Sequence, residues 1–287
     1  MVARFVPWWV KIGIKVVLSR LPVNHHTFWR RFGLFRHGYM DSTQYIISNF
    51  ESLFYFGGVS TTNVSNKTMV ELGPGDSNGT AVVAASYGLK PILIDVDDFA
   101  THDMDTYRDL MLELSLSSGV FSKLNAVNSF EELLSVCDAK YLTNGTQSLS
   151  RLSDSSVDFI ISQACLEHVK KCEFDTLVGE LYRISISGSL NIHSIDFKDH
   201  LSYSLNNLRF SEEFWESQIV SSSGFYTNRL RYPDMKSAFV SAGFEIVKED
   251  IFFWDSVPLP KHKLHSIFHK YDEQDLRIKE AKIVLRK

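Results

Sequence analysis

The stretch Met69-Val70-Glu71-Leu72-Gly73-Pro74-Gly75-Asp76-Ser77-Asn78-Gly79 decides the fold of this chain. The apolar run that begins at Thr68 reads as a buried strand and continues directly into a glycine turn. The following segment, 80–87, is rich in small residues and is expected to form a helix packed closely on a sheet. Because glycines let the backbone approach a ligand and the first N–H groups of a helix lack intrahelical partners, the stretch predicts a nucleotide-binding turn.

Two common nucleotide motifs are excluded by the residues of this turn. The dinucleotide fingerprint requires a glycine at its sixth position, which Asn78 occupies, and a P-loop requires Gly-Lys-Ser/Thr after its glycines, which is absent. An acidic residue, Glu71, stands two positions before the first glycine. A carboxylate at that place suits a ligand with a cationic group, such as the ammonium of a methionine-like compound.

A second segment supports the same interpretation. The run Pro91-Ile92-Leu93-Ile94-Asp95-Val96-Asp97-Asp98 ends in acidic residues roughly twenty positions past the glycine turn, where the second strand of a βαβ unit ends. A carboxylate at that strand tip can accept both hydroxyls of a ribose. Asp95 is the preferred residue for this role and Asp97 the second choice, whereas Asp98 is expected to be solvated.

A third segment, 155–169, has Asp158 at the start of an apolar strand and Leu166-Glu167-His168 at the start of the next helix. We expect Asp158 itself to be structural. With Glu71-Leu72-Gly73-Pro74-Gly75 and the acidic strand tip, this segment resembles the class I S-adenosylmethionine-dependent methyltransferases, and within them the type 11-like group that acts on small molecules and glycans. The resemblance covers about a third of the chain, residues 68–169.

The resemblance implies an α/β fold with a doubly wound, mostly parallel seven-stranded sheet (a Rossmann-like methyltransferase fold), helices on both faces and an antiparallel hairpin at one edge. It implies S-adenosyl-L-methionine as the cofactor. Ser77 stands where the family usually has a third glycine. Thr146 stands where the family often has an aspartate that receives the adenine amino group, and a plain Asn-Gly turn is an equal alternative there. The cofactor-binding residues expected from the resemblance are Glu71, Gly73, Gly75, Ser77, Asp95, Val96, Thr146 and Gln163.

The strand expected at 190–195, after a turn at Ser187-Gly188-Ser189, is followed by the polar segment Asp196-Phe197-Lys198-Asp199-His200. Ligands of open α/β sheets lie at the carboxyl ends of the strands, so an acceptor would meet these side chains. We interpret His200 as a general base oriented by Asp196, with a charged loop as the equal alternative. His168 is a third catalytic candidate, against which stands the interpretation as a packed or solvated histidine.

The last third of the chain is expected to carry an insertion at about 200–232, before the final strands. In it Tyr226, Asn228 and Arg229 have donors and flat faces suited to a sugar or phosphate, and we expect them to contact the substrate. A helix at 234–242 and strands at 244–247, 251–254 and 282–285 should follow. Three histidines share one face at helical spacing, for which a basic solvated helix or an interface is preferred over a metal site: His262, His265 and His269.

Residues 1–56 are expected to form a helical extension or lid in front of a methyltransferase domain at 57–287. The apolar run from Phe5 to Leu18 carries lysines and is too short and too charged to span a bilayer. Two interpretations stay open. The segment lies on an anionic membrane surface, or, as we slightly prefer, it packs on the domain or covers the active site.

Composition limits the partners. The formal net charge of −4 gives no reason to expect nucleic acid, and three cysteines without paired spacing indicate reduced thiols. We expect a cytoplasmic enzyme, with contact at the inner membrane face as the alternative, that methylates a small-molecule or glycan acceptor, by O-methylation of a sugar or lipid-linked saccharide. A non-catalytic cofactor-binding scaffold or a membrane-recruited module is the alternative function. No metal is expected, and the oligomeric state is left open.

Overall fold

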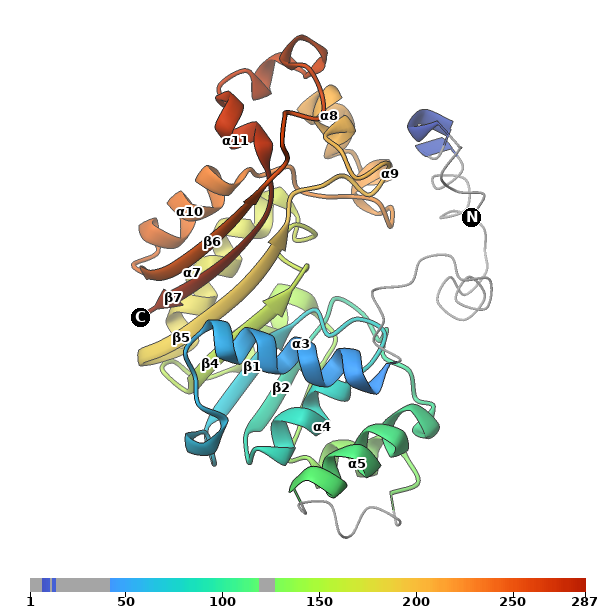
Figure 1. The fold of residues 1–287 in the computed structure, drawn as a ribbon, viewed down its shortest axis with the longest axis vertical. Helices are drawn as coiled ribbons and strands as arrows, with labels where there is room; N and C mark the ends of the chain where they lie inside the picture. Colours follow the sequence, from blue (N-terminus) through green and yellow to red (C-terminus); the bar gives the residue numbers. More distant parts are fainter. Residues whose placement is uncertain (1–6, 11, 14–41, 119–126) are drawn as a thin grey trace.

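The structure is a computed structural model that describes residues 7–10, 12–13, 42–118 and 127–287. Seven strands form one sheet in the order β3-β2-β1-β4-β5-β7-β6 (Figure 1). Neighbouring strands are parallel except that β7 runs antiparallel to both β5 and β6. The predicted fold, with its antiparallel hairpin at one edge, is confirmed. The strands are β1 (Thr68–Leu72), β2 (Lys90–Ile94), β3 (Lys140–Leu142), β4 (Val157–Gln163), β5 (Ser185–Asp196), β6 (Glu245–Phe253) and β7 (Ile278–Arg286).

Helices cover both faces of the sheet (Figure 1). One face carries α3, α4, α5 and α6, and the other carries α7 and α10. Short helices connect the remaining segments at the end of the sheet where the insertion lies. The longer helices are α3 (Thr43–Phe56), α4 (Gly79–Ser86), α5 (Met104–Ser118), α6 (Phe130–Val136), α7 (Phe174–Ile184) and α10 (Tyr232–Ser241), and the shorter ones include α8 (Glu212–Trp215), α9 (Gln218–Ser221) and α11 (Glu273–Arg277).

The core is two layers, one on each side of the strands. Along β1, Met69 packs with the α3 side, whereas Val70 and Leu72 pack with the α7 side. Along β4, Phe159 and Ile160 divide in the same way. Successive side chains of a strand point to opposite faces, so a strand covered on both faces is apolar throughout, which is why these segments were recognisable in the sequence.

Three local expectations were wrong. Strand β5 begins at Ser185 and includes the expected turn Ser187-Gly188-Ser189, at a register shift relative to β4. Strand β6 is continuous over Glu245–Phe253, where two strands were expected. The three histidines do not lie on one helix, because their segment forms two separate 3-10 turns, Lys261–Lys263 and Ser266–Phe268, and His265 caps the second through its side chain. In the described part of the chain, no group of three or more His, Cys, Asp or Glu side chains is placed to hold a metal.

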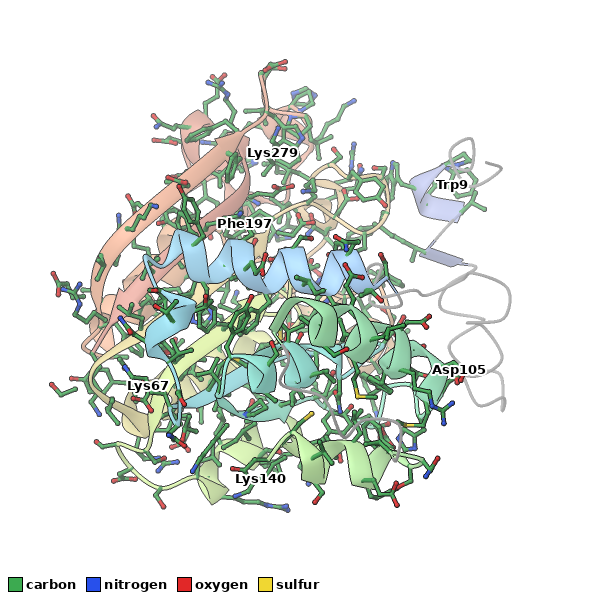
Figure 2. The ribbon with its side chains drawn as sticks, turned by 60° about the horizontal axis from the view of Figure 1, so that its bottom comes forward. Trp9, Lys67, Asp105, Lys140, Phe197 and Lys279 are labelled. Carbon is green, nitrogen blue, oxygen red and sulfur yellow. The ribbon has the colours of Figure 1, made fainter. Side chains whose placement is uncertain are left out.

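The described part of the N-terminal segment contacts the insertion. Trp8 packs edge-on against Phe210, with ring centroids 6.0 Å apart, and the Arg209 guanidinium lies 5.2 Å from the Trp8 ring. Ile12 joins the same apolar cluster, whereas Trp9 is 63% exposed (Figure 2). The lysines of the apolar run, Lys11 and Lys15, lie outside the described residues. Among the helices that the structure describes, none is long and apolar enough to cross a bilayer.

A histidine is buried in the middle of the sheet. His193 on β5 has no exposed surface, its Nδ1 lies 2.8 Å from the Ser162 hydroxyl on β4, and its ring stacks on Phe239. Burial lowers the pKa of His193 from 6.5 to about 3. The imidazole is therefore neutral in the folded protein near neutral pH.

This burial predicts acid sensitivity. Because the unfolded chain binds a proton at His193 below about pH 6.5 and the folded protein does so only near pH 3, stability should fall as the pH drops between these values. In His193→Gln, the free energy of unfolding should fall with decreasing pH by on the order of 1 kcal/mol less per pH unit than in the parent protein. Urea unfolding of both proteins between about pH 7 and pH 5 checks it, and parallel curves for the two proteins would contradict the assignment.

Candidate functional site

The glycine turn between β1 and α4 requires its two glycines. Gly73 and Gly75 have φ of +68° and +71°, the left-handed region that side chains disfavour. A Cβ added at Gly73 would lie 2.6 Å from the Cys165 sulfur, a contact that a folded protein does not accommodate without movement. The Gly73 N–H donates to the carbonyl of Ile94 at 2.8 Å, which holds the turn against the end of β2.

Asp95 joins the end of β2 to this turn. The side chain is buried, one carboxylate oxygen accepts from the Gly75 N–H at 3.2 Å, and the other accepts from the Val96 N–H at 2.7 Å. The Val96 side chain is exposed. Asp97, the second choice, is exposed and accepts from the N–H of Asp98 in a local turn. The structure therefore places Asp95, of the two, beside the glycines.

Glu71 lies on the other side of the turn. It is 5% exposed, its Oε1 accepts from the Thr80 hydroxyl of α4 at 3.2 Å, and its Oε2 is buried without a hydrogen-bond partner among the described residues. Burial raises the pKa of Glu71 to about 8, and the negative charge of Asp95 adds to the rise. Strands β1 and β2 are parallel, with Glu71 opposite Leu93 and Leu72 opposite Ile94, so Glu71 and Asp95 lie at the same edge of the sheet.

Two further residues of the turn are buried. The Ser77 hydroxyl accepts from the Gly79 N–H at 3.0 Å and so supports the start of α4. Asn78 is fully buried, and neither its side-chain oxygen nor its nitrogen has a partner in the part of the chain that the structure describes. The signal in the sequence is an asparagine at a position where the dinucleotide fingerprint has a glycine.

The rest of the expected cofactor set lies at or just after the ends of β3 and β4. The Gly145 N–H donates to the Asp95 carbonyl at 2.8 Å, which places Thr146, half-buried, after β3. Gln163 is half-buried at the last position of β4. Cys165, which sequence analysis missed, lies among the acids: burial raises the pKa of its thiol, and the charges of Asp95, Glu167 and Glu71 raise it further.

The structure gives Asp196, the expected orienter, a lysine as its partner. Asp196 ends β5, and its Oδ1 accepts from the Lys198 backbone N–H at 2.8 Å and lies 3.2 Å from the Lys198 ammonium. Lys198 also pairs with Glu280 on β7. The His200 ring instead packs edge-on against the His168 ring, with centroids 4.8 Å apart. Two of the three catalytic candidates therefore meet at the carboxyl ends of β4 and β5, and Asp196 is paired with a lysine.

The three expected substrate residues have internal partners. The Asn228 amide nitrogen donates to the carbonyls of Leu166 at 2.8 Å and Val169 at 3.0 Å. The Arg229 side chain is 1% exposed and pairs with Glu212 at 2.9 Å. The Tyr226 hydroxyl donates to Glu216 at 2.7 Å. Asn228 therefore ties the insertion to the domain, whereas the Arg229 and Tyr226 contacts lie within the insertion.

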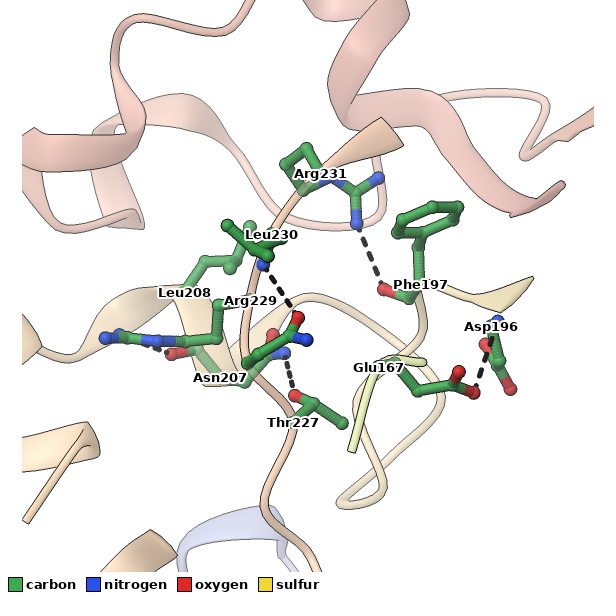
Figure 3. A pocket seen from close by; sticks show the side chains of 10 residues that line it. Glu167, Asp196, Phe197, Asn207, Leu208, Thr227, Arg229, Leu230 and Arg231 are labelled. Atoms are coloured by element: carbon green, nitrogen blue, oxygen red, sulfur yellow. Dashed lines mark hydrogen bonds between the residues drawn. The ribbon is translucent and has the colours of Figure 1, made fainter. Parts of the chain in front are cut away.

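Sequence analysis also missed Glu167 as a buried acid. It is 2% exposed, and its Oε1 accepts from the Asp196 N–H at 3.2 Å, while burial raises its pKa to about 8. Its Oε2 has no partner among the described residues. Glu167, Asn207 and Arg231 line a small polar cavity with room for about one water molecule (Figure 3). This cavity lies beside β5 and the insertion, and it is too small for a nucleoside.

No protein-family model matches this sequence, and no curated protein matches it. The fold is similar to several solved structures. A phosphoethanolamine N-methyltransferase 2 of Haemonchus contortus, solved with phosphomonomethylethanolamine and S-adenosylhomocysteine, is 14% identical over 84% of this chain, with a TM-score of 0.45. The alignment covers 52% of that protein, so this chain spans about half its length.

Two other similar structures are of more comparable length. A SAM-dependent methyltransferase from Archaeoglobus fulgidus is 10% identical over 86% of this chain and 95% of its own, with a TM-score of 0.47. The [4+2]-cyclase SpnF is 12% identical over 84% of this chain and 80% of its own, with a TM-score of 0.48. These similarities concern the fold.

Proposed function

We propose that this protein is a methyltransferase that uses S-adenosyl-L-methionine. The observation that carries the proposal is the placement of Glu71 and Asp95 on either side of the Gly73–Gly75 turn, at the carboxyl ends of two adjacent parallel strands. Ligands of doubly wound sheets occupy this position. The buried, unpartnered Glu71 Oε2 and the unpartnered amide of Asn78 provide groups that fit a ligand with a cationic head and several polar atoms.

Each expected residue has a role in holding this cofactor. Glu71 would bind its ammonium group, and Asp95 would accept its ribose hydroxyls. The backbone at Gly73 and Gly75 would approach it most closely. When bound, the cofactor supplies a methyl group on a positively charged sulfur, which departs as a neutral thioether. The remaining residues proposed to contact it are Ser77, Asn78, Val96, Thr146 and Gln163.

We further propose a small-molecule or glycan acceptor, methylated on oxygen, with a sugar or lipid-linked saccharide as the first candidate. The histidine pair at the ends of β4 and β5 supports an acceptor that loses a proton, because an imidazole is a suitable base near neutral pH. Most of the remaining catalysis would come from alignment of acceptor, methyl carbon and sulfur. Tyr226, Asn228 and Arg229 would act by building the insertion beside this site.

The N-terminal extension is proposed as a cover for the acceptor end of the site. Trp8 and Ile12 pack on the insertion cluster, which includes Trp215 and Phe225. This contact supports the packing interpretation over the membrane interpretation for the described residues of the segment.

Product formation tests the proposed function. The full-length chain should release S-adenosylhomocysteine when incubated with S-adenosyl-L-methionine and fractionated cell extract, and an extract fraction rich in saccharides should give the largest signal. Chromatographic measurement of S-adenosylhomocysteine, with Asp95→Ala as the inactive control, checks it. Tight cofactor binding without turnover in any fraction would instead support the non-catalytic scaffold.

A further inference from the structure

We propose that His168 is the general base of the methyl transfer. Tyr226, which belongs to the insertion, positions His168 by fixing the tautomer of its ring. The proposal rests on the proposed function for its chemistry, but the tautomer itself follows from geometry. It changes the order of the candidates, because sequence analysis preferred His200 with Asp196.

The hydrogen bond of His168 defines which ring nitrogen carries the proton. The His168 Nδ1 lies 2.8 Å from the Tyr226 backbone carbonyl oxygen. A carbonyl oxygen accepts hydrogen bonds and donates none, so Nδ1 must be the donor. A neutral imidazole with its proton on Nδ1 has its lone pair on Nε2. Nε2 is therefore the nitrogen that can take a proton, and the ring that carries it is exposed.

Tyr226 is itself held in place. The side chain is 4% exposed, its hydroxyl donates to Glu216 at 2.7 Å, and the same hydroxyl accepts from the Lys171 backbone N–H at 3.2 Å. The Tyr226 N–H donates to the Ser223 carbonyl at 3.0 Å. The carbonyl that binds His168 thus belongs to a residue fixed at its backbone and at its ring, and one of these contacts comes from the segment that follows His168.

Asn228 ties the same two segments together on the other side. Its N–H donates to the Glu167 carbonyl at 2.7 Å, and its side-chain amide donates to the carbonyls of Leu166 and Val169. Residues 166–169 and residues 226–228 therefore form one hydrogen-bonded unit with His168 in the middle. The His200 ring packs edge-on against His168 and limits its rotation further.

The other candidate pair lacks this arrangement. The Asp196 carboxylate is bound to Lys198, which reduces its availability to orient an imidazole. An oriented histidine with a defined tautomer has the features that general-base catalysis requires, since the accepting nitrogen must face the proton that it removes. The acceptor class that follows is one that must lose a proton during transfer, which a hydroxyl group fits.

The step balances without a further reactant. The acceptor oxygen forms a bond to the methyl carbon while the carbon–sulfur bond breaks and its electron pair remains on sulfur. The acceptor proton passes to Nε2 of His168, and the resulting imidazolium releases a proton to solvent from the same nitrogen. The Nδ1 proton stays in its hydrogen bond to Tyr226 throughout.

The tautomer can be measured without a substrate. At a pH at which the ring is neutral, the full-length chain labelled with ¹⁵N-histidine should show a His168 ring with a protonated Nδ1 and an unprotonated Nε2. The His168 signals are assigned by their loss in His168→Gln. Tyr226→Phe, which removes the hydroxyl that anchors the carbonyl, should shift the ring toward a mixture of tautomers. Tyr232→Phe is the matched control, because that tyrosine is equally buried and its hydroxyl also donates to a glutamate, Glu249.

Kinetics separate the base from the cofactor site. With the acceptor fraction found in the product assay, His168→Gln should lower kcat by about 100-fold or more, because glutamine can still donate to Tyr226 but cannot take a proton. In His168→Gln and in Tyr226→Phe, the affinity for the cofactor should stay within about twofold of that of the parent protein. A neutral His168 ring with its proton on Nε2, or full kcat in His168→Gln, would overturn the proposal. Absent cofactor binding by the parent protein would overturn the proposed function instead.

Discussion

Asp95→Ala should lower the affinity for S-adenosyl-L-methionine by about 100-fold or more. The substitution removes a buried carboxylate that would accept two hydroxyl hydrogen bonds, and hydrogen bonds to charged groups contribute about 1.5–3 kcal/mol each. It also removes the acceptors of the Gly75 and Val96 N–H groups, so the turn loses part of its support. Isothermal titration calorimetry with the purified full-length proteins measures the change directly.

Two variants make this test specific. Asp98→Ala removes an exposed acid from the same acidic segment and should leave the affinity unchanged, because the Asp98 carboxylate pairs with His102 on the surface. Asp95→Asn keeps the size and one accepting oxygen and should lose less affinity than the alanine variant. Thermal unfolding shows whether Asp95→Ala remains folded. A folded Asp95→Ala protein with parental affinity would remove Asp95 from the cofactor site and, with it, the main support for the proposed function.

The turn proposed to hold the cofactor could be located because its residues are close together in sequence. The glycines at 73 and 75 were recognisable from their spacing, and the structure shows the left-handed backbone that requires them. Asp95 was placed correctly at a strand tip because a parallel sheet brings the ends of neighbouring strands to one edge. Asp158 was expected to be structural, and its carboxylate accepts from the Thr68 N–H at the start of β1.

The acceptor side could not be predicted because its contacts join residues far apart in the chain. Asn228 and Arg229 have the donors of a sugar-binding site, and nothing in the local sequence shows that backbone carbonyls and Glu212 use these donors. His168 finds its partner carbonyl 58 positions later in the chain. Tertiary contacts of this kind decide whether a polar side chain is structural or available to a ligand.

Buried acids were missed for a related reason. Glu167 follows a strand and precedes a helix, where a glutamate is usually solvated, but the insertion covers it and its pKa rises to about 8. Asp196 was assigned to His200 because the two are close in sequence, whereas the folded chain gives Asp196 a lysine two positions away.

Binding of S-adenosyl-L-methionine should release a proton from Glu71. As the pH is raised toward 8, the affinity for this ligand should therefore increase by up to about tenfold per pH unit. Burial keeps the pKa of Glu71 at about 8 in the free protein, so most of the carboxyl is protonated at pH 7. An ammonium placed beside it favours the charged form and lowers that pKa. The linkage therefore has a defined sign: affinity falls as the pH drops below 8.

Calorimetry in buffers of different ionisation enthalpy measures the protons released, and three comparisons assign them. Glu71→Gln should abolish the release and weaken binding at pH 8 by about tenfold or more, as expected for a lost charge-assisted hydrogen bond. Glu167→Gln removes the other acid with a pKa of about 8 and should leave the release unchanged if Glu71 is its source. 5′-Methylthioadenosine keeps the nucleoside but lacks the ammonium, so it should bind without releasing a proton. Equal proton release with both ligands would place the ammonium away from Glu71. The acid before the glycines would then support the turn through Thr80 alone.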